Sequence, residues 1–565
     1  MWGIADNSSF TKYPKTAYIC LLKAKSNMDN SRNYPTTTHY FPNLIEDASI
    51  YVDKTQFIVP LLANKSNSNF FLSRPRRFGK SLFVSSLEQV FLGNKEMFKG
   101  LYIYDKIPWE SYPVIRLSLD KIGYASIGLE QALYAEIKKI AKDHQILLEE
   151  AGYDRLFAEF IKKLAEKYQK RVVILVDEYD KPIINYIEKE NTSQAEINRD
   201  ILKSFYGVLK DNGEYLRFVF ITGVSKFSKV SIFSDLNYFD DLTLDAAFVN
   251  ICGFTEAELR HYCYAGLADL AEKENGSVET IVDKIRYWYD GFSWNGKDFL
   301  YNPYSTMLLM KKQVFDNYWF TSGTPTFLVK LLNKTHQYQL KDIKLKSSIY
   351  EWYDLRELDY LSIMLQTGYL TFKKHLSEDY YIASYPNKEV ENAFSEMLLG
   401  GYLHKHPARM AVTVLDIQEA FERHDVEKVI DILTEMFKTL PSQFFHEDKE
   451  LIDAQGNKKI VTTAVGESFY HAVIYLVFNI LGIRMPVEVS SQQGRIDAVV
   501  ETAGYIYIFE FKKDTKAKAA IAQITKRNYP QHFALSKKQI YLIGVSFSLQ
   551  KKGISDHKIE VFPKM

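Results

Sequence analysis

The sequence predicts an α/β protein of several domains, and two patterns support this. Up to Gly223, continuous runs of β-branched and other apolar residues alternate with helical segments, which is typical of a parallel sheet covered on both faces. From Gly466 the expected order becomes one helix, three strands, one helix and one strand. With 565 residues, 46% hydrophobic and 25% charged, the chain is long enough for three or four domains and too apolar for wholesale disorder.

The first α/β segment has the clearest pattern. Each of its expected strands is a short apolar run, and each helix repeats apolar residues every three or four positions. Strands are expected at 69–73, 114–119, 172–176 and 218–221, and helices at 81–91, 126–149, 155–168 and 196–211.

The rest of the chain divides into a mostly helical middle and a second α/β unit. In the middle, short strands are expected near 369–372 and 380–383. The final unit is expected to contain a helix at 466–481, strands at 485–490, 495–501 and 505–512, a helix at 517–527 and a strand at 539–546.

Domain limits follow from these changes of pattern. Residues 1–42 are interpreted as a polar tail, 43–250 as the first domain, 251–445 as the helical middle and 446–565 as the last domain. The polar stretch 447–457 is interpreted as loop material at the last boundary. Met28 opens a hydrophilic segment and is a candidate for the true start of the protein.

A candidate phosphate-binding loop, Arg74-Pro-Arg-Arg-Phe-Gly-Lys-Ser81, lies between an expected strand and an expected helix. In the pattern GxxxxGK[ST], backbone N–H groups and a helix N-terminus surround the phosphates of a nucleotide. Lys80 would reach the β- and γ-phosphates of ATP, and the Ser81 hydroxyl would bind Mg²⁺. Arg74 stands where the pattern has its first glycine, and an ordinary helix start is the alternative interpretation. The expected ATP-binding residues of the loop are Arg77, Phe78, Gly79, Lys80, Ser81 and Leu82.

Two acids at the end of the apolar strand 172–176 fit the same chemistry. Asp177 would hold Mg²⁺ through water, and Glu178 would orient or deprotonate the attacking water. Alternatively, both acids cap the next helix. Thr222 and Ser225 follow a further strand and are candidates for sensing the γ-phosphate, although a turn with locally bonded hydroxyls is an equal alternative.

At this point the chain resembles a known family, the bacterial AAA-ATPase-like proteins. The segments that carry the resemblance are Tyr51-Val-Asp-Lys-Thr55, Arg74 to Leu82, Asp177-Glu-Tyr-Asp-Lys-Pro182, Thr222-Gly-Val-Ser-Lys-Phe-Ser228 and Ile251-Cys-Gly-Phe-Thr-Glu256. The resemblance runs from about residue 43 to the end and implies a P-loop NTPase domain in which a residue such as Arg74 is typical. It also implies a C-terminal nuclease-like domain of the PD-(D/E)XK superfamily. Further segments resemble the family without an assigned chemistry: Tyr289-Asp-Gly-Phe292, Tyr301-Asn-Pro-Tyr304, Tyr318-Trp319 and Pro386-Asn-Lys-Glu-Val390.

A second group of charged residues lies near the C-terminus. Gly494-Arg-Ile-Asp497 begins one expected strand, and Glu510-Phe-Lys512 ends the next. Because side chains alternate along a strand, Glu510 and Lys512 share a face, and Asp497 can lie near Glu510 if the strands pair. The paired carboxylates could bind a divalent metal beside a DNA phosphate, and the lysine could position or activate water and offset the charge. The alternative is an exposed strand on which charges happen to alternate.

This region resembles the PD-(D/E)XK superfamily, with its restriction-endonuclease-like fold. The residues that fall on the superfamily's motif positions are Glu467, Asp497, Glu510, Lys512 and Gln523. The resemblance implies that they form the catalytic set, that Asp497 and Glu510 bind Mg²⁺ or Mn²⁺, and that Gln523 positions water or phosphate. Gly-Arg-Ile-Asp replaces the Pro-Asp form of the motif.

Charge is unevenly distributed along the chain. The whole protein has 71 basic and 70 acidic residues, a net charge of +1. Residues 461–565 hold 14 of the basic and 8 of the acidic residues, so their net charge is +6 and the rest carries −5. A basic module suits the phosphate backbone of DNA, whereas a solvated lysine-rich helix is the alternative.

We therefore expect an enzyme that couples ATP hydrolysis to metal-dependent cleavage of nucleic acid. One alternative is an ATP-switched protein that binds DNA or a partner without cleaving. Another is a P-loop kinase, which the 97-residue gap between Lys80 and Asp177 disfavours. A homo-oligomer is left open. No apolar run reaches the roughly 18 residues of a membrane span, and three cysteines without a CxxC pair favour a cytoplasmic protein with reduced thiols.

Overall fold

The structure, a computed structural model, forms two compact units, which are described separately. The first comprises Met1–Trp319 and Asp342–Asn387, and the second comprises Phe320–Lys341 and Lys388–Met565. For 401–403, 407–411, 446–452, 458–464 and 467–472 only the backbone is described. The structure describes residues 33–63, 68–187, 191–226, 239–319, 328, 331–332, 340–350, 359–403, 407–438, 446–452, 458–464, 467–480, 496–548, 550–551 and 553–563.

A five-stranded parallel sheet forms the centre of the first unit, in the order β2-β3-β4-β1-β5. Its strands are β1 (Asn69–Ser73), β2 (Val114–Ser118), β3 (Val172–Asp177), β4 (Leu216–Gly223) and β5 (Asp240–Asp241). Every residue of β3 and β4 is buried, as continuous apolar runs require in a sheet covered on both faces.

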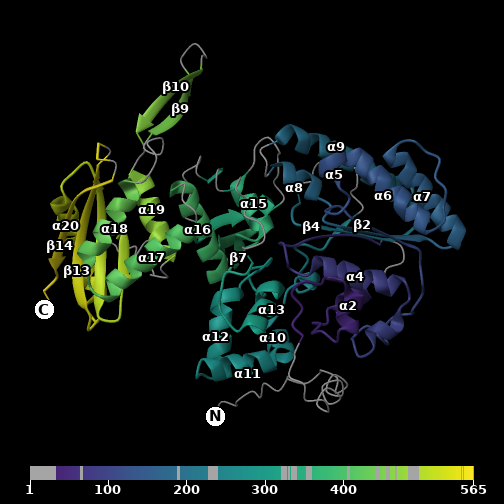
Figure 1. Cartoon of the computed structure of the whole chain (residues 1–565), viewed down its shortest axis with the longest axis horizontal. Helices are drawn as coiled ribbons and strands as arrows, with labels where there is room; N and C mark the ends of the chain where they lie inside the picture. The colour runs from purple at the N-terminus through teal and green to yellow at the C-terminus, as the bar shows by residue number, and fades with distance from the viewer. Residues whose placement is uncertain are drawn as a thin grey trace. The chain divides into compact units, whose positions relative to one another are not determined.

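Helices cover both faces of this sheet (Figure 1). One face carries α4 (Lys80–Phe91) and α2 (Phe41–Glu46), and the other carries α6 (Leu129–Asp143), α7 (Tyr153–Tyr168) and α9 (Thr192–Asp211). Shorter helices are α3 (Ile58–Ala63), α5 (Tyr124–Ile127) and α8 (Lys181–Ile187). Because β1, β3 and β4 are parallel, their carboxyl ends lie at one edge of the sheet, where all the predicted nucleotide-binding residues follow.

The remainder of the first unit is helical with one small sheet. Its helices are α10 (Glu256–Tyr262), α11 (Tyr264–Lys273), α12 (Val278–Tyr289), α13 (Pro303–Lys312) and α15 (Tyr360–Thr367). The antiparallel sheet has the order β6-β8-β7, with β6 (Ile343–Lys346), β7 (Thr371–Ser377) and β8 (Tyr380–Ser384). The two short strands predicted near 369–372 and 380–383 are therefore confirmed.

A four-stranded mixed sheet forms the centre of the second unit. β12 (Tyr505–Lys513) is antiparallel to β11 (Ala498–Glu501) and parallel to β13 (Gln539–Ser548), which pairs with an antiparallel β14 (Gly553–Val561). One face packs against α20 (Ala517–Lys526), and the helices of the other are α16 (Lys388–Leu403), α17 (Pro407–Glu422), α18 (Val426–Lys438) and α19 (Glu467–Ile480) (Figure 1). The predicted fold class, a parallel-sheet domain followed by a helical region and a second α/β domain, is confirmed.

One segment predicted as a loop is part of a hairpin in the structure. The segment predicted as a loop at 447–457 is wrong for residues 447–452, because β9 (His446–Ile452) pairs with β10 (Lys458–Ala464) in an antiparallel hairpin. The β-branched residues of β10 favour this pairing, which satisfies the backbone of the charged β9. The strand predicted at 485–490 lies outside the described residues, as do Met28, Cys20 and Gly494.

Cys252 and Cys263 are buried free thiols. Within the described part of the chain, no helix has the length and apolar character needed to span a membrane.

Candidate nucleotide and nuclease sites

The loop between β1 and α4 has two residues in the left-handed region. Arg77 has φ 61° and Gly79 has φ 100°, a conformation that strongly favours glycine at position 79. α4 begins at Lys80 with no side-chain cap on its N-terminus. Its first-turn N–H groups are therefore available to donate hydrogen bonds to the oxygens of a phosphate.

Lys80 is buried inside this loop. Its Nζ donates hydrogen bonds to the carbonyl oxygens of Arg74 at 2.9 Å and Pro75 at 3.0 Å. The charge is thus held among backbone dipoles beside the first turn of α4.

Arg74, at the start of the loop, is fully buried. Its guanidinium donates to the carbonyl oxygens of Ser73, Thr243, Phe248 and Val249 and lies 4.0 Å from the ring centre of Trp294. Its φ is not positive, so a residue with a Cβ fits there without backbone strain. This explains how an arginine can replace the first glycine of the pattern.

Asp177 ends β3 and lies beside the start of α4. Its side chain is buried, and it accepts a hydrogen bond from the Ser81 hydroxyl. Burial raises the pKa of this carboxyl, while the Ser81 hydrogen bond and the charge of Lys80 act in the opposite direction. Its Oδ1 has no hydrogen-bond partner among the described residues. Such a carboxylate beside a hydroxyl is a suitable oxygen set for Mg²⁺, and the neighbouring Glu178 is half-buried at φ 52°.

The two predicted γ-phosphate sensors both bond within the protein. The Ser225 hydroxyl donates to Asp180 Oδ2 at 2.6 Å, and the Thr222 hydroxyl donates to the carbonyl oxygen of Leu72 at 2.8 Å. Asp180 is fully buried and also accepts the N–H groups of Val224 and Ser225. Sequence reasoning did not single out Asp180, although it is the third acid of Asp177-Glu-Tyr-Asp180. A phosphate-sensing role for Ser225 stays a prediction.

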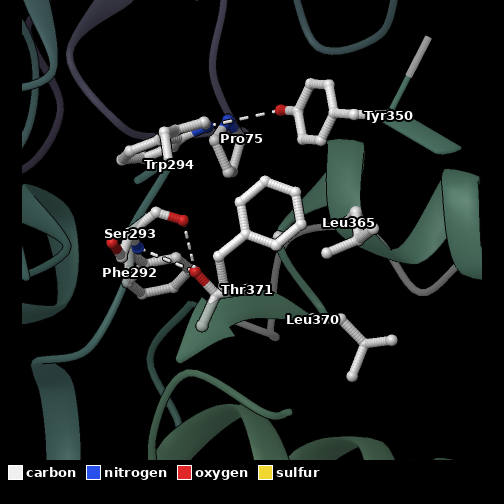
Figure 2. Close-up of a pocket in the computed structure, with 10 residues that line it drawn as sticks. Pro75, Phe292, Ser293, Trp294, Tyr350, Leu365, Leu370 and Thr371 are labelled. Atoms are coloured by element: carbon white, nitrogen blue, oxygen red, sulfur yellow. Dashed lines mark hydrogen bonds between the residues drawn. The ribbon is translucent and has the colours of Figure 1, made fainter. Parts of the chain in front are cut away.

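Aromatic residues from distant segments pack against the loop. Figure 2 shows Pro75 beside Trp294 and Tyr350, whose Nε1 and hydroxyl are joined by a 3.3 Å hydrogen bond. The pocket between them has a volume of about 10 Å³, room for at most one water, so it is no nucleotide pocket. Phe78 packs edge-on against Trp294 at 5.2 Å. Phe78 also packs edge-on against Phe292 at 5.1 Å, so the family segment that ends at Phe292 supports the loop together with Trp294.

The second site centres on Glu510, whose side chain is buried in β12. Lys512 Nζ donates to Glu510 Oε1 at 2.9 Å, and the Gln523 amide donates to the same oxygen from α20. Glu510 Oε2 has no partner among the described residues. As predicted, β12 places Glu510 and Lys512 on one face, and α20 adds Gln523 to them.

Asp497 completes the group. Its Oδ2 accepts the N–H of Phe511 at 2.8 Å, which holds Asp497 next to Glu510. Burial raises the pKa of Glu510 to about 7, and the charge of Asp497 adds to this effect. Lys512 and Arg527 act in the opposite direction. Arg527 was not among the residues predicted from the sequence.

The fit to a divalent metal rests on this carboxylate pair. A buried carboxylate oxygen without a partner is what a Mg²⁺ or Mn²⁺ ligand needs, so Asp497 and Glu510 fit such an ion. Within the described side chains, no group of three His, Cys, Asp or Glu residues forms a ready metal cluster. Glu467 begins α19, but its side chain lies outside the described residues.

Fold and sites together define a P-loop ATPase-like protein with a nuclease-like domain. Residues 35–233 match the model of the predicted AAA-ATPase family, and residues 465–557 match that of the PD-(D/E)XK nuclease superfamily. A protein of Azotobacter chroococcum mcd 1, described as "Uncharacterized protein in vnfD 5'region", is 33% identical over 529 residues, 91% of this chain and 96% of the relative. No solved structure matches the chain. The chain belongs to the predicted AAA-ATPase-like family and carries a C-terminal domain of the PD-(D/E)XK nuclease superfamily.

Proposed function

We propose that this protein hydrolyses ATP in its first unit and cleaves DNA with a divalent metal in its second, and that ATP turnover controls access of DNA. One observation supports both halves. Asp177 and Glu510 are buried carboxylates that each leave one oxygen without a partner among the described residues, and each lies beside a lysine. Burying such charge is costly unless a bound cation offsets it.

In the proposed ATP site, backbone N–H groups of residues 77–82 hold the phosphates. Lys80 exchanges the two loop carbonyls for the β- and γ-phosphate oxygens. Ser81 and Asp177 would hold Mg²⁺, which when bound offsets the negative charge of the phosphates. Glu178 orients the attacking water and accepts its proton.

In the proposed nuclease site, Asp497 and Glu510 would hold Mg²⁺ or Mn²⁺. An ion bound there supplies an acidified water and stabilises negative charge on the phosphodiester. Lys512 orients the attacking water and offsets the charge of the carboxylates, while Gln523 keeps Glu510 in place. Glu467 is proposed as a further acid of this set.

The ATP half is tested by nucleotide binding and hydrolysis. Lys80→Ala should abolish binding or hydrolysis, and Glu178→Gln should bind ATP without turnover. Lys99→Ala removes an exposed lysine from the same unit and should behave as wild type. Mg²⁺-dependent ATP binding and hydrolysis that are both equally strong in wild type and Lys80→Ala would overturn this half.

The nuclease half is tested with labelled single-stranded DNA, double-stranded DNA and RNA in Mg²⁺ or Mn²⁺, with and without ATP. Lys512→Ala should lose cleavage, whereas Lys518→Ala, at an exposed position of α20, should retain it. The alternative is an ATP-switched binding protein. It is supported if wild type binds DNA in an ATP-dependent manner and, like Lys512→Ala, does not cleave it.

A further inference from the structure

An arginine with no role assigned so far lies beside the carboxylates of the second unit. Arg527 directly follows α20, and its backbone N–H bonds the carbonyl oxygen of Gln523 at 3.0 Å. Residues four apart on a helix share a face. Since Gln523 donates to Glu510, Arg527 lies one turn further along the same face of α20.

The side chain of Arg527 is anchored at one point. Its Nη1 donates to the hydroxyl of Tyr529 at 3.2 Å, and Tyr529 is fully buried in the apolar cluster that also holds Ile506 and Ile521. The hydrogen bond to Tyr529 raises the pKa of Arg527, and the charges of Glu510 and Asp497 add to this effect. Among the described residues, Arg527 forms no ion pair with a carboxylate, so its charge is available to an incoming anion.

The site needs such a charge. Asp497 and Glu510 would repel a phosphodiester, and the nearest cation, Lys512, already pairs with Glu510. A guanidinium matches two oxygens of a phosphate through parallel hydrogen bonds, which an ammonium does not.

We propose that Arg527 binds a non-bridging oxygen of the DNA phosphodiester that lies at the Asp497–Glu510 pair. Arg527 transfers no proton; it holds the phosphate against the two carboxylates and stabilises the charge that develops during hydrolysis. Tyr529 is the positioning residue that fixes the guanidinium. This inference rests on the proposed action of the second unit on DNA.

The test compares full-length variants in steady-state cleavage of a labelled DNA oligonucleotide with Mn²⁺. Arg527→Met removes the positive charge, and Arg527→Lys keeps the charge but loses the two parallel N–H donors of the guanidinium. Lys526→Met is the control, because it removes a positive charge from an exposed neighbouring residue. Arg527→Met should lower kcat/KM about 10²-fold, the usual effect of losing one stabilising donor. Arg527→Lys should recover part of this loss, and Lys526→Met should stay close to wild type.

Salt dependence separates a phosphate contact from a structural effect. Loss of one contact should reduce the slope of log affinity against log salt by about 0.9 on duplex DNA or about 0.7 on a single strand. Arg527→Met should show this change, and Tyr529→Phe, which keeps the charge, should not. Tyr529→Phe should instead lower kcat with unchanged slope. Melting temperatures equal to that of wild type confirm that each variant is folded.

The outcomes distinguish this inference from the proposed function. Equal kcat/KM and slope for Arg527→Met and Lys526→Met, in a cleaving wild type, overturn the role of Arg527 alone. If wild type binds DNA without cleaving it, the nuclease proposal fails, and an unchanged binding slope in Arg527→Met then overturns the inference separately. A wild type that binds no DNA overturns both.

Discussion

Replacing Asp290 by Asn should stabilise the first unit above pH 6 and leave its stability near pH 4 unchanged. Asp290 follows α12, and its Oδ1 is buried without a partner among the described residues. Burial raises the pKa of Asp290 from 3.8 to about 6. The Gly291 N–H and the charges of Lys373 and Arg286 oppose the shift, and the charge of Glu256 adds to it.

The magnitude follows from proton linkage. A rise from 3.8 to about 6 is worth about 3 kcal/mol, at about 1.36 kcal/mol per pKa unit. Asp290 ionises at a lower pH in the unfolded chain than in the folded protein. The free energy of unfolding of wild type therefore falls by this amount as the pH rises from about 4 to about 6. Above pH 6 the loss is complete and constant. The Asn side chain carries no charge, so Asp290→Asn avoids the whole penalty.

Urea unfolding followed by tryptophan fluorescence between pH 4 and pH 8 measures the effect. Because the chain has two compact units, the same unfolding transition is compared between proteins. Asp298→Asn is the matched control, since Asp298 is exposed on the loop that follows. A stability difference between Asp290→Asn and wild type that does not change with pH would refute the reasoning.

Three further predictions concern the two sites. Gly368 has φ 89°, and a Cβ there would lie 2.7 Å from Pro75 of the phosphate-binding loop. Gly368→Ala should therefore lower the melting temperature and, by displacing the loop, weaken ATP binding. An unchanged ATP affinity would contradict this. Mn²⁺ should raise the melting temperature of wild type and not that of Glu510→Gln, and equal shifts would argue against metal binding at Glu510. The Trp319 indole donates to the carbonyl oxygen of Arg76 at 3.0 Å, so ATP should change the fluorescence of wild type and of Trp288→Phe but much less that of Trp319→Phe.

The strands that the sequence predicts well are those with the strongest apolar signal. β3 and β4 are buried at every position, and their runs of Val, Ile, Leu and Phe have no other stable environment. β5 has only two residues, both Asp, and β14 is an edge strand in which polar and apolar residues are mixed. Neither strand therefore has an apolar run in the sequence from which it could be predicted. The β9–β10 hairpin was missed for the same reason, since charge predicted a loop.

Candidate site residues were predicted where they belong to a sequence motif and missed where they do not. Motif spacing predicts that Lys80, Ser81 and Asp177 meet, and the order of parallel strands brings them together. Arg527 gives no such signal, because one cation in a lysine-rich segment is indistinguishable from a solvated one until its neighbours are known. The packing of Trp294 on Arg74 is equally invisible, since it joins segments more than 200 residues apart.

The buried carboxylates link stability to function. Asp177, Asp290 and Glu510 each keep a buried oxygen without a partner among the described residues, and burial raises the pKa of each. A neutral residue of the same shape would be less costly at each position, so stability alone does not explain them. The Ser81 hydroxyl bonds the Asp177 carboxyl, and the charge of Asp497 acts on Glu510. A divalent cation bound at either place would replace the free-energy cost of the buried charge by a stabilisation that grows with metal concentration. At Asp290 the charges of two cations, Lys373 and Arg286, already offset part of the cost, so we expect metal to leave its contribution to stability unchanged.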